Sequence, residues 1–231
     1  MPLSIRQVAT TDQAVPANPI TMTFGAATLP TSMIVWLHAR RNLTGAPAPD
    51  GTWTGRASNP LSTSGGGGSG GRLWAYERQA VGETTFDIPN SGSNVSRSFA
   101  LEVDAGGNEI NFDGESELTT GSFLTSLTAG TITPTSGASC ILLLLGVNVN
   151  GRAVAAGSNV TEISNALEPG SVNPRVWLGY RVIPSASGGY TPSFDVTGGL
   201  SDAHAALVLD YREIIIPGGI WVPPMPPVFG F

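Results

Sequence analysis

The sequence Ile141-Leu-Leu-Leu-Leu145, which leads into Val147-Asn-Val149, decides the fold class of this chain. A continuous apolar run of this length is typical of a central β-strand with apolar layers on both of its faces. No stretch of the chain combines helical periodicity with good helix formers, so a buried helix is not favoured. We therefore expect residues 141–145 to form the central strand of a β-sheet.

Several other short runs have the composition and spacing of strands. Residues 98–103 and 176–182 alternate with a period of two, as strands with one buried and one exposed face do. The 30 glycines and 18 prolines cluster between the runs, where they mark turns. The further expected strands are 33–38, 73–78 and 205–211, with weaker candidates at 20–24, 84–88 and 193–196.

About nine strands separated by turn residues predict an all-β fold, a β-sandwich of jelly-roll type. A chain of 231 residues is long enough for one such sandwich with a single core. We assign residues 1–212 to this domain, with 1–15 as a candidate N-terminal arm and 62–71 as a Gly-rich loop. Residues 213–231 are then an extended, Pro-rich C-terminal arm.

The low content of charged residues and the scattered arginines indicate which kinds of partner to expect. Charged residues make up only 12% of the chain, about half the share of an ordinary soluble domain. Either the surface is rich in Ser, Thr and Asn, or neighbouring subunits cover much of it. The net charge is −6 and all 11 basic residues are scattered arginines, so we expect no nucleic-acid partner.

The C-terminal segment has the composition of a docking arm. No charged side chain follows Glu213, and the prolines at 223, 224, 226 and 227 favour an extended, polyproline-like path. An apolar segment of this kind gains free energy when it is buried against another surface. We expect it to dock on a neighbouring subunit, the alternative being that it folds back on its own sandwich. Its expected anchors are Ile220, Trp221, Val222, Met225, Val228, Phe229 and Phe231.

Patterns associated with catalysis are weak in this sequence. The run Gly67-Gly-Ser-Gly-Gly71 matches the serine-hydrolase pattern only because it lies in a glycine tract, without the strand–turn–helix context. The histidines, His38 and His204, are isolated, and we interpret His204 as a surface residue near a turn. We therefore expect no catalytic residues, no metal site and no cofactor.

Two features leave ligand binding open. The acidic residues Asp104, Glu109, Asp113, Glu115 and Glu117 suit a solvated turn, with calcium binding or glycoside hydrolysis as alternatives. Trp53 follows a turn and is the best candidate for stacking on a sugar, although a place in the core is the competing interpretation. Trp74 and Trp177 have the same two interpretations.

The single cysteine, the first residues and the lengths of the apolar runs indicate where the protein is made. The single cysteine, Cys140, predicts a buried, inert thiol rather than a disulfide. The first residues lack the pattern of a signal peptide, and no apolar run is long enough to span a bilayer. We expect synthesis in a cytoplasm and no membrane insertion.

Several segments follow one another in a recognisable order of strands and turn residues. They are Asp50-Gly-Thr-Trp-Thr54, Arg72-Leu-Trp-Ala-Tyr-Glu-Arg78, Gly82-Glu-Thr-Thr-Phe86, the alternating run 98–103, Pro192-Ser-Phe-Asp-Val196 and Leu207-Val-Leu-Asp-Tyr211. Together they resemble β-sandwich modules of tailed-bacteriophage virion proteins, and the resemblance covers about residues 15–212.

This resemblance implies a jelly-roll-like fold and a non-enzymatic structural role in the virion, as a minor tail, tail-tip or capsid decoration protein. The expected partners are copies of the chain and other virion proteins, met through the sandwich surface and the arm. The alternative function is a carbohydrate-binding adhesion module of a tail fibre or baseplate, which contacts host-surface glycan through Trp53. Hydrolysis of glycans by a pair of the acidic residues is a third hypothesis.

Overall fold

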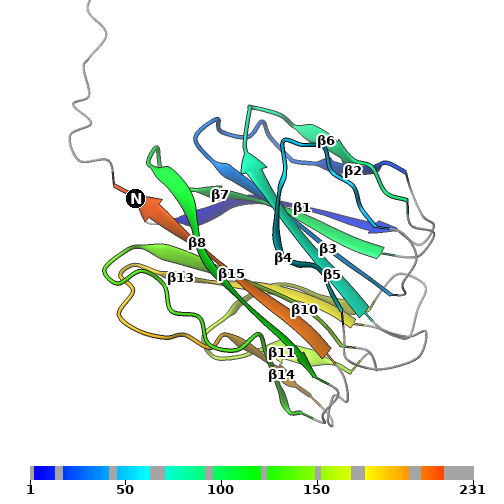
Figure 1. Ribbon diagram of the computed structural model, residues 1–231, viewed down its shortest axis with the longest axis vertical. Coiled ribbons are helices and arrows are strands. Elements are labelled where there is room, and N and C mark those ends of the chain that lie inside the picture. Colours follow the sequence, from blue (N-terminus) through cyan, green and yellow to red (C-terminus); the bar gives the residue numbers. More distant parts are fainter. Residues whose placement is uncertain are drawn as a thin grey trace, which may run out of the picture.

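The protein is built from β-strands, as the sequence predicts. The computed structural model describes residues 3–13, 18–41, 46–62, 71–91, 96–120, 124–148, 152–167, 175–197 and 204–215. Every regular element in these ranges is a strand, and the strands form antiparallel sheets that pack on one another (Figure 1). The predicted all-β sandwich is therefore confirmed.

The strands fall into two consecutive series along the chain. The first series is β1 (Ser4–Gln13), β2 (Ile20–Thr23), β3 (Met33–Arg41), β4 (Thr54–Ser62), β5 (Gly71–Gln79), β6 (Thr85–Ile88) and β7 (Ser96–Asp104). The second is β8 (Glu109–Thr120), β9 (Ser126–Thr128), β10 (Cys140–Asn148), β11 (Val154–Ala156), β12 (Thr161–Leu167), β13 (Arg175–Ile183), β14 (Ser193–Val196) and β15 (His204–Ile214). All the strands expected from the sequence are present.

Two five-stranded sheets form the middle of the molecule. Their strand orders are β1-β7-β3-β5-β4 and β12-β13-β10-β15-β8. They pack face to face around a central core, because alternate residues of the strands in both sheets are apolar and point inward. The central core includes Val35, Leu37, Phe99 and Leu101 from the first sheet and Leu143, Leu145, Leu207 and Leu209 from the second.

A smaller sheet covers the outer face of each five-stranded sheet. Strands β2 and β6 pack Ile20, Met22 and Ile88 onto the first sheet. Strands β11, β14 and β9 pack Val154, Phe194 and Leu127 onto the second sheet. The molecule therefore has four layers (Figure 1). Strand β10 has apolar neighbours on both faces, as expected for residues 141–145.

The two series of strands repeat one topology. Strands β1, β7, β3, β5 and β4 are matched in order by β8, β15, β10, β13 and β12, and the β2–β6 pair is matched by β9–β14. The bridge from Pro47 to Asn90 takes the place that β11 has beside β14. We call β1–β7 the N-terminal module and β8–β15 the C-terminal module.

Strand registers align the two modules residue by residue. Trp74 pairs with His38 and Trp177 pairs with Gly146, so these pairs occupy equivalent places in the two five-stranded sheets. Both tryptophans are fully buried and face the outer layer of their own module. Gly146 is required there, because a Cβ atom on it would come within 1.8 Å of the Trp177 ring.

The sandwich has two different ends. At one end, which we call the loop end, strands β4, β5, β12 and β13 meet connections that lie outside the described residues. The first and last described strands meet at the other end, which we call the terminal end: Ser4 pairs with Asp104, Ile214 pairs with Glu109, and a short turn connects Asp104 to Glu109 (Figure 1). Residues Ser4–Gln13, considered above as a candidate arm, form the edge strand β1.

Candidate functional site

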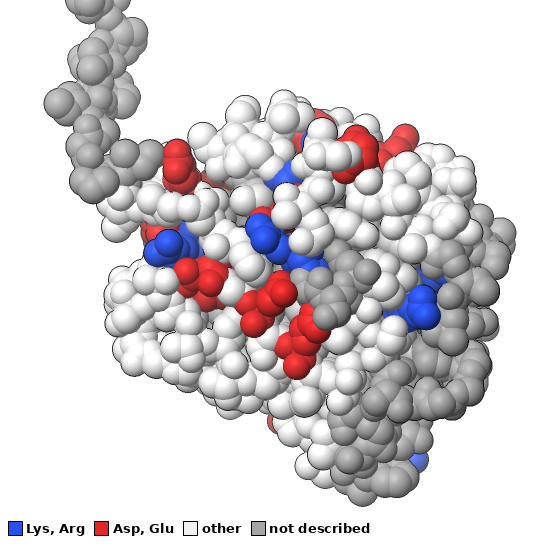
Figure 2. Space-filling model, in the orientation of Figure 1, with Lys and Arg blue, Asp and Glu red and all other residues white. Residues whose placement is uncertain are grey.

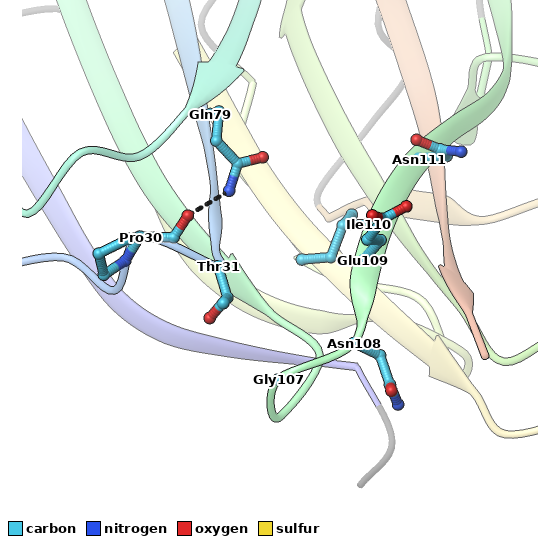
Figure 3. A pocket seen from close by; sticks show the side chains of 8 residues that line it. All are labelled: Pro30, Thr31, Gln79, Gly107, Asn108, Glu109, Ile110 and Asn111. Carbon is cyan, nitrogen blue, oxygen red and sulfur yellow. Dashed lines mark hydrogen bonds between the residues drawn. The ribbon is translucent and has the colours of Figure 1, made fainter. Parts of the chain in front are cut away.

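A pocket of about 380 Å³ opens at the terminal end, where the two modules meet (Figure 3). The turn before β3 supplies Pro30 and Thr31, and the end of β5 supplies Gln79. The connection from β7 into β8 supplies the rest of the lining, residues 107–111. The pocket is therefore built by both modules.

Hydrogen bonds fix the walls of this pocket. The Gln79 side-chain amide donates to the carbonyls of Pro30, at 2.7 Å, and Ser32, at 2.8 Å. The Asn108 amide donates to the Glu213 carboxylate, which ties the lining to the end of β15. Of the eight lining residues only Glu109 has an acidic side chain, and Thr31, Gln79, Asn108 and Asn111 add hydroxyl and amide groups. The lining therefore offers both donors and acceptors of hydrogen bonds to a ligand.

Exposed apolar side chains gather at the same end of the molecule. Among the described residues, four large hydrophobic side chains are exposed, and three of them lie here. Leu29 adjoins the pocket residue Pro30 and is 36% exposed, and Val81 follows the pocket residue Gln79 and is 70% exposed. Ile215, 73% exposed, follows Ile214, which pairs with the pocket residue Glu109.

The C-terminal segment begins at this place. Residues 216–231, including all seven expected arm anchors, lie outside the described residues. The described chain ends at Ile215, next to the pocket wall. The structure thus fixes the root of the segment and not its path.

Trp53 lies in a cluster of aromatic and charged side chains on the N-terminal module. Its half-buried ring is 5.2 Å from that of Phe86, and the Arg78 guanidinium lies 4.8 Å from the ring centre. Arg78 is also paired with Glu83. Trp74 and Trp177, by contrast, are buried in the two modules, so neither of them presents a surface for stacking.

The acidic residues between 104 and 117 are spread along β8 instead of converging. Asp104 accepts a hydrogen bond from the backbone of Gly106 at 3.0 Å and so shapes the turn into β8. Figure 2 shows acidic side chains in a line over β8, with basic side chains beside it. Among the described residues, no three His, Cys, Asp or Glu side chains converge to hold a metal ion.

Two carboxyl groups come close together beneath this line. Asp113, at a bulge in β8, accepts hydrogen bonds from the Thr135 amide at 2.6 Å and its hydroxyl at 2.7 Å. Asp210 on β15 is 1% exposed, and among the described residues no nitrogen or hydroxyl donor lies within hydrogen-bond distance of its oxygens; the donor beside it is the Cys140 thiol. Burial raises the pKa of Asp210 to about 7, and the neighbouring Asp113 carboxylate adds to the rise.

Cys140 lies beside this carboxyl pair. It is buried, as predicted, and burial raises the pKa of its thiol to about 12, with Asp210 contributing. A thiol with such a pKa is protonated at neutral pH and is not a nucleophile. Asp113, Asp210 and Cys140 therefore form a cluster of the C-terminal module in which one carboxyl group has a pKa near neutral.

Both histidines are buried, which corrects the interpretation of His204 as a surface residue. His38 contacts the Ser98 hydroxyl through Nδ1 at 2.8 Å, and burial, with help from Arg40, lowers its pKa to about 3. His204 begins β15 with its side chain inside the C-terminal module, and burial lowers its pKa too. The structure places the two residues in different modules, on β3 and β15.

Comparisons with protein-family models, with curated proteins and with solved structures found no match to this chain. The described part of the chain contains no helix that is long and apolar enough to cross a membrane. Ser69 of the glycine tract lies outside the described residues. Sequence reasoning named Trp53 and Asp113 but missed Asp210, because nothing in the alternating run 205–211 marks one polar position as facing another carboxyl group.

Proposed function

We propose that the protein is a non-enzymatic structural component of a phage virion, a minor tail, tail-tip or capsid decoration protein, that assembles through its terminal end. The observation that carries the proposal is the position of Ile215, at the root of an apolar, uncharged segment and beside a two-module pocket. The phage assignment itself rests on the sequence resemblance over about residues 15–212.

The chemistry of the segment suits the terminal end. Proline has no N–H group, so a Pro-rich segment presents mainly carbonyl acceptors and needs donors on its receptor. The exposed Thr31 and Asn111 side chains offer such donors in the pocket, and Ile110 offers an apolar wall. Leu29 and Val81 extend this wall on the surface. Burying the aromatic residues of the segment here is worth about 25 cal/mol per Å².

The position of Ile215 would allow two copies of the chain to exchange their C-terminal segments. The 16 residues after Ile215 can span about 50 Å when extended, with about 3.1 Å for each residue. Two copies that meet by their terminal ends would place the root of each segment near the pocket of the other. Such an arrangement is isologous and closes on itself as a dimer.

Light scattering after size exclusion tests this function. The full chain is expected to be a defined oligomer, and a chain that ends at Ile215 is expected to be a folded monomer with unchanged strand content. Val81→Ser and Leu29→Ser should weaken the oligomer, while Val8→Ser, which changes the exposed apolar side chain on β1, should not. A full chain that is monomeric and gains no mass with increasing concentration would contradict assembly through the segment.

One observation favours adhesion to host glycan as a second candidate function. Trp53 and Phe86 are half-buried aromatic residues next to Arg78 and close to Asp50, and such groups together can stack on and hydrogen-bond a sugar. Saccharide titrations followed by Trp fluorescence and NMR should show binding that Trp53→Ala abolishes and Val8→Ser leaves unchanged. Equal binding by the two variants would remove this candidate.

A further inference from the structure

The buried carboxyl groups of the two modules occupy equivalent positions. Glu102 is directly opposite Ile34 in the pairing of β7 with β3, and Asp210 is directly opposite Leu142 in the pairing of β15 with β10. The strand that flanks each carboxyl residue carries a bulge at the same place, at Arg6 in β1 and at Asp113 in β8. The side chains at these two bulges have opposite charge: the Arg6 guanidinium faces Glu102, whereas the Asp113 carboxyl group faces Asp210.

Glu102 has a full set of donors. Its carboxylate accepts hydrogen bonds from Arg6 at 2.7 Å, Gln7 at 2.6 Å, the Ser32 hydroxyl at 2.7 Å and the Leu29 amide at 2.7 Å. Burial alone would raise its pKa, but these hydrogen bonds outweigh burial and hold the pKa below its usual value. In the N-terminal module an ionised carboxylate thus holds the loop before β3.

In the C-terminal module the role of loop anchor has moved to Asp113. Asp113 accepts from the Thr135 amide and hydroxyl, and Arg212 Nε lies 3.1 Å from its Oδ1. Arg6 and Gln7 are replaced here by Asp113 and Gly114, so no donor from β8 takes their place beside Asp210. A buried carboxylate whose neighbouring donor is the weak Cys140 thiol is costly, whereas a protonated Asp210 can donate to an oxygen of Asp113.

We propose that Asp113 and Asp210 share one proton and form a pH-sensitive latch that holds the β9–β10 loop onto the C-terminal module. The latch is closed when Asp210 is protonated and donates to Asp113. When Asp210 loses its proton, two like charges face each other in a buried site, and the anchor of Thr135 is weakened. The proposal does not depend on the assembly function.

The direction of the pH effect follows from the protonation equilibrium. Asp210 has a pKa of about 7 in the folded chain against 3.8 for the ordinary side chain, so the folded state holds the proton more tightly. The stability that this group contributes is complete below about pH 4, declines as the pH rises through about 7, and is absent above it. The charged and titratable groups around the pair are Cys140 on β10, Arg181 on β13 and Arg212 on β15.

The histidines act in the opposite direction and must be separated from this effect. Their pKa values are lowered in the folded state, so they add stability as the pH rises toward their ordinary value. The measurement that isolates the latch is therefore a difference between the wild-type chain and a variant that lacks only the Asp210 titration. Asp210→Asn serves this purpose, because its amide remains neutral and can donate to Asp113 at every pH.

Urea unfolding of the full chain, from about pH 5 to about pH 8.5, tests the proposal. We expect the folding equilibrium constant of the wild type, relative to Asp210→Asn, to fall by roughly tenfold or more across this range. The matched control is Glu102→Gln in the other module, which should lower stability by a constant factor and leave the pH dependence of the wild type intact. Parallel curves for the wild type and Asp210→Asn would overturn the latch.

Two further measurements keep the test decisive if a variant fails to fold. Carboxyl ¹³C NMR of the wild-type chain should show one carboxyl group that titrates near neutral pH, and the absence of any carboxyl titration above about pH 6 would overturn the proposal. Addition of about 5 mM CaCl₂ at pH 8 should leave stability unchanged. A large stabilisation by calcium would identify a cation site in place of a shared proton.

Discussion

The N-terminal and C-terminal modules share one topology but surround their equivalent buried carboxyl groups, Glu102 and Asp210, with different neighbours. In the first, Arg6 and Gln7 satisfy Glu102 from the edge strand. In the second, the edge strand brings Asp113, which takes over the loop-anchoring role, and Asp210 has the weak Cys140 thiol beside it in place of such donors. The comparison teaches that a repeated topology fixes where a carboxyl group is buried, while the hydrogen bonds around it decide whether its pKa is lowered or raised.

The largest expected effect tests whether the shared central core depends on both modules equally. Leu143→Ala should lower the free energy of unfolding by about 2–5 kcal/mol, because Leu143 is fully buried and leaves a cavity between the sheets. Val35→Ala, at the equivalent place in the N-terminal module, should cost less because fewer buried atoms are removed. Chemical denaturation measures both, and a loss below about 1 kcal/mol for Leu143→Ala would contradict the burial of Leu143 in the central core.

The second-largest effect on stability is expected beside the buried tryptophans, where Gly146 and His38 occupy equivalent positions in the two modules. Gly146→Ala should destabilise the chain by about 1–3 kcal/mol, because the new Cβ atom would collide with the Trp177 ring. At the equivalent position in the N-terminal module, His38→Ala removes volume and the bond to Ser98 instead. Near-ultraviolet circular dichroism should report a disturbed tryptophan environment in the first variant. An unchanged spectrum and stability would mean that Trp177 can move freely.

A third prediction concerns the ionised carboxylate of the N-terminal module. Glu102→Gln should cost about 1–3 kcal/mol at neutral pH, because buried donors lose a charged acceptor. Since the pKa of Glu102 is lowered in the folded chain, the stability that this group provides is present above about pH 4.5. It is lost as the pH falls through the pKa that Glu102 has in the folded chain. Thermal unfolding between about pH 2.5 and 5 should therefore show a steeper acid loss in the wild type than in the variant.

The smallest effect on stability is expected at the terminal end. Val81→Ser changes a side chain that is 70% exposed, so the free energy of unfolding should stay within about 0.5 kcal/mol. Its effect on oligomer mass should nevertheless be clear if the C-terminal segment docks at this end. If Val81→Ser lowered the free energy of unfolding but left the mass of the oligomer unchanged, Val81 would contribute to folding and not to assembly.

Sequence reasoning missed six of the described strands, the three-residue strands β9 and β11 and the longer strands β1, β4, β8 and β12, and the four longer ones share a structural cause. Strands β1, β4, β8 and β12 are the four edges of the two five-stranded sheets. An edge strand has one partner and a more exposed face, so its apolar pattern is weak, as in Thr161–Leu167, where no residue is fully buried. Register irregularities in all four strands disturb the alternation further.

The candidate sites were predictable only in part for a related reason. Trp53 stood out because a tryptophan after a turn is unusual, and the C-terminal segment stood out by its prolines and its lack of charge. The pocket and the Asp113–Asp210 pair could not be found in this way. Each is made of residues about 30 to 100 positions apart, which only strand pairing brings together.

The sequence by itself determined the all-β class, the interior strands and the burial of Cys140, because local composition and alternation carry that information. Tertiary structure alone decided the repeated topology, the position of Ile215 beside the pocket at the terminal end, and the raised pKa of Asp210. These properties depend on which strands become neighbours and in what register. A carboxyl group has the same sequence signal whether its partner across the sheet is Arg6 or Asp113, and only the fold supplies that partner.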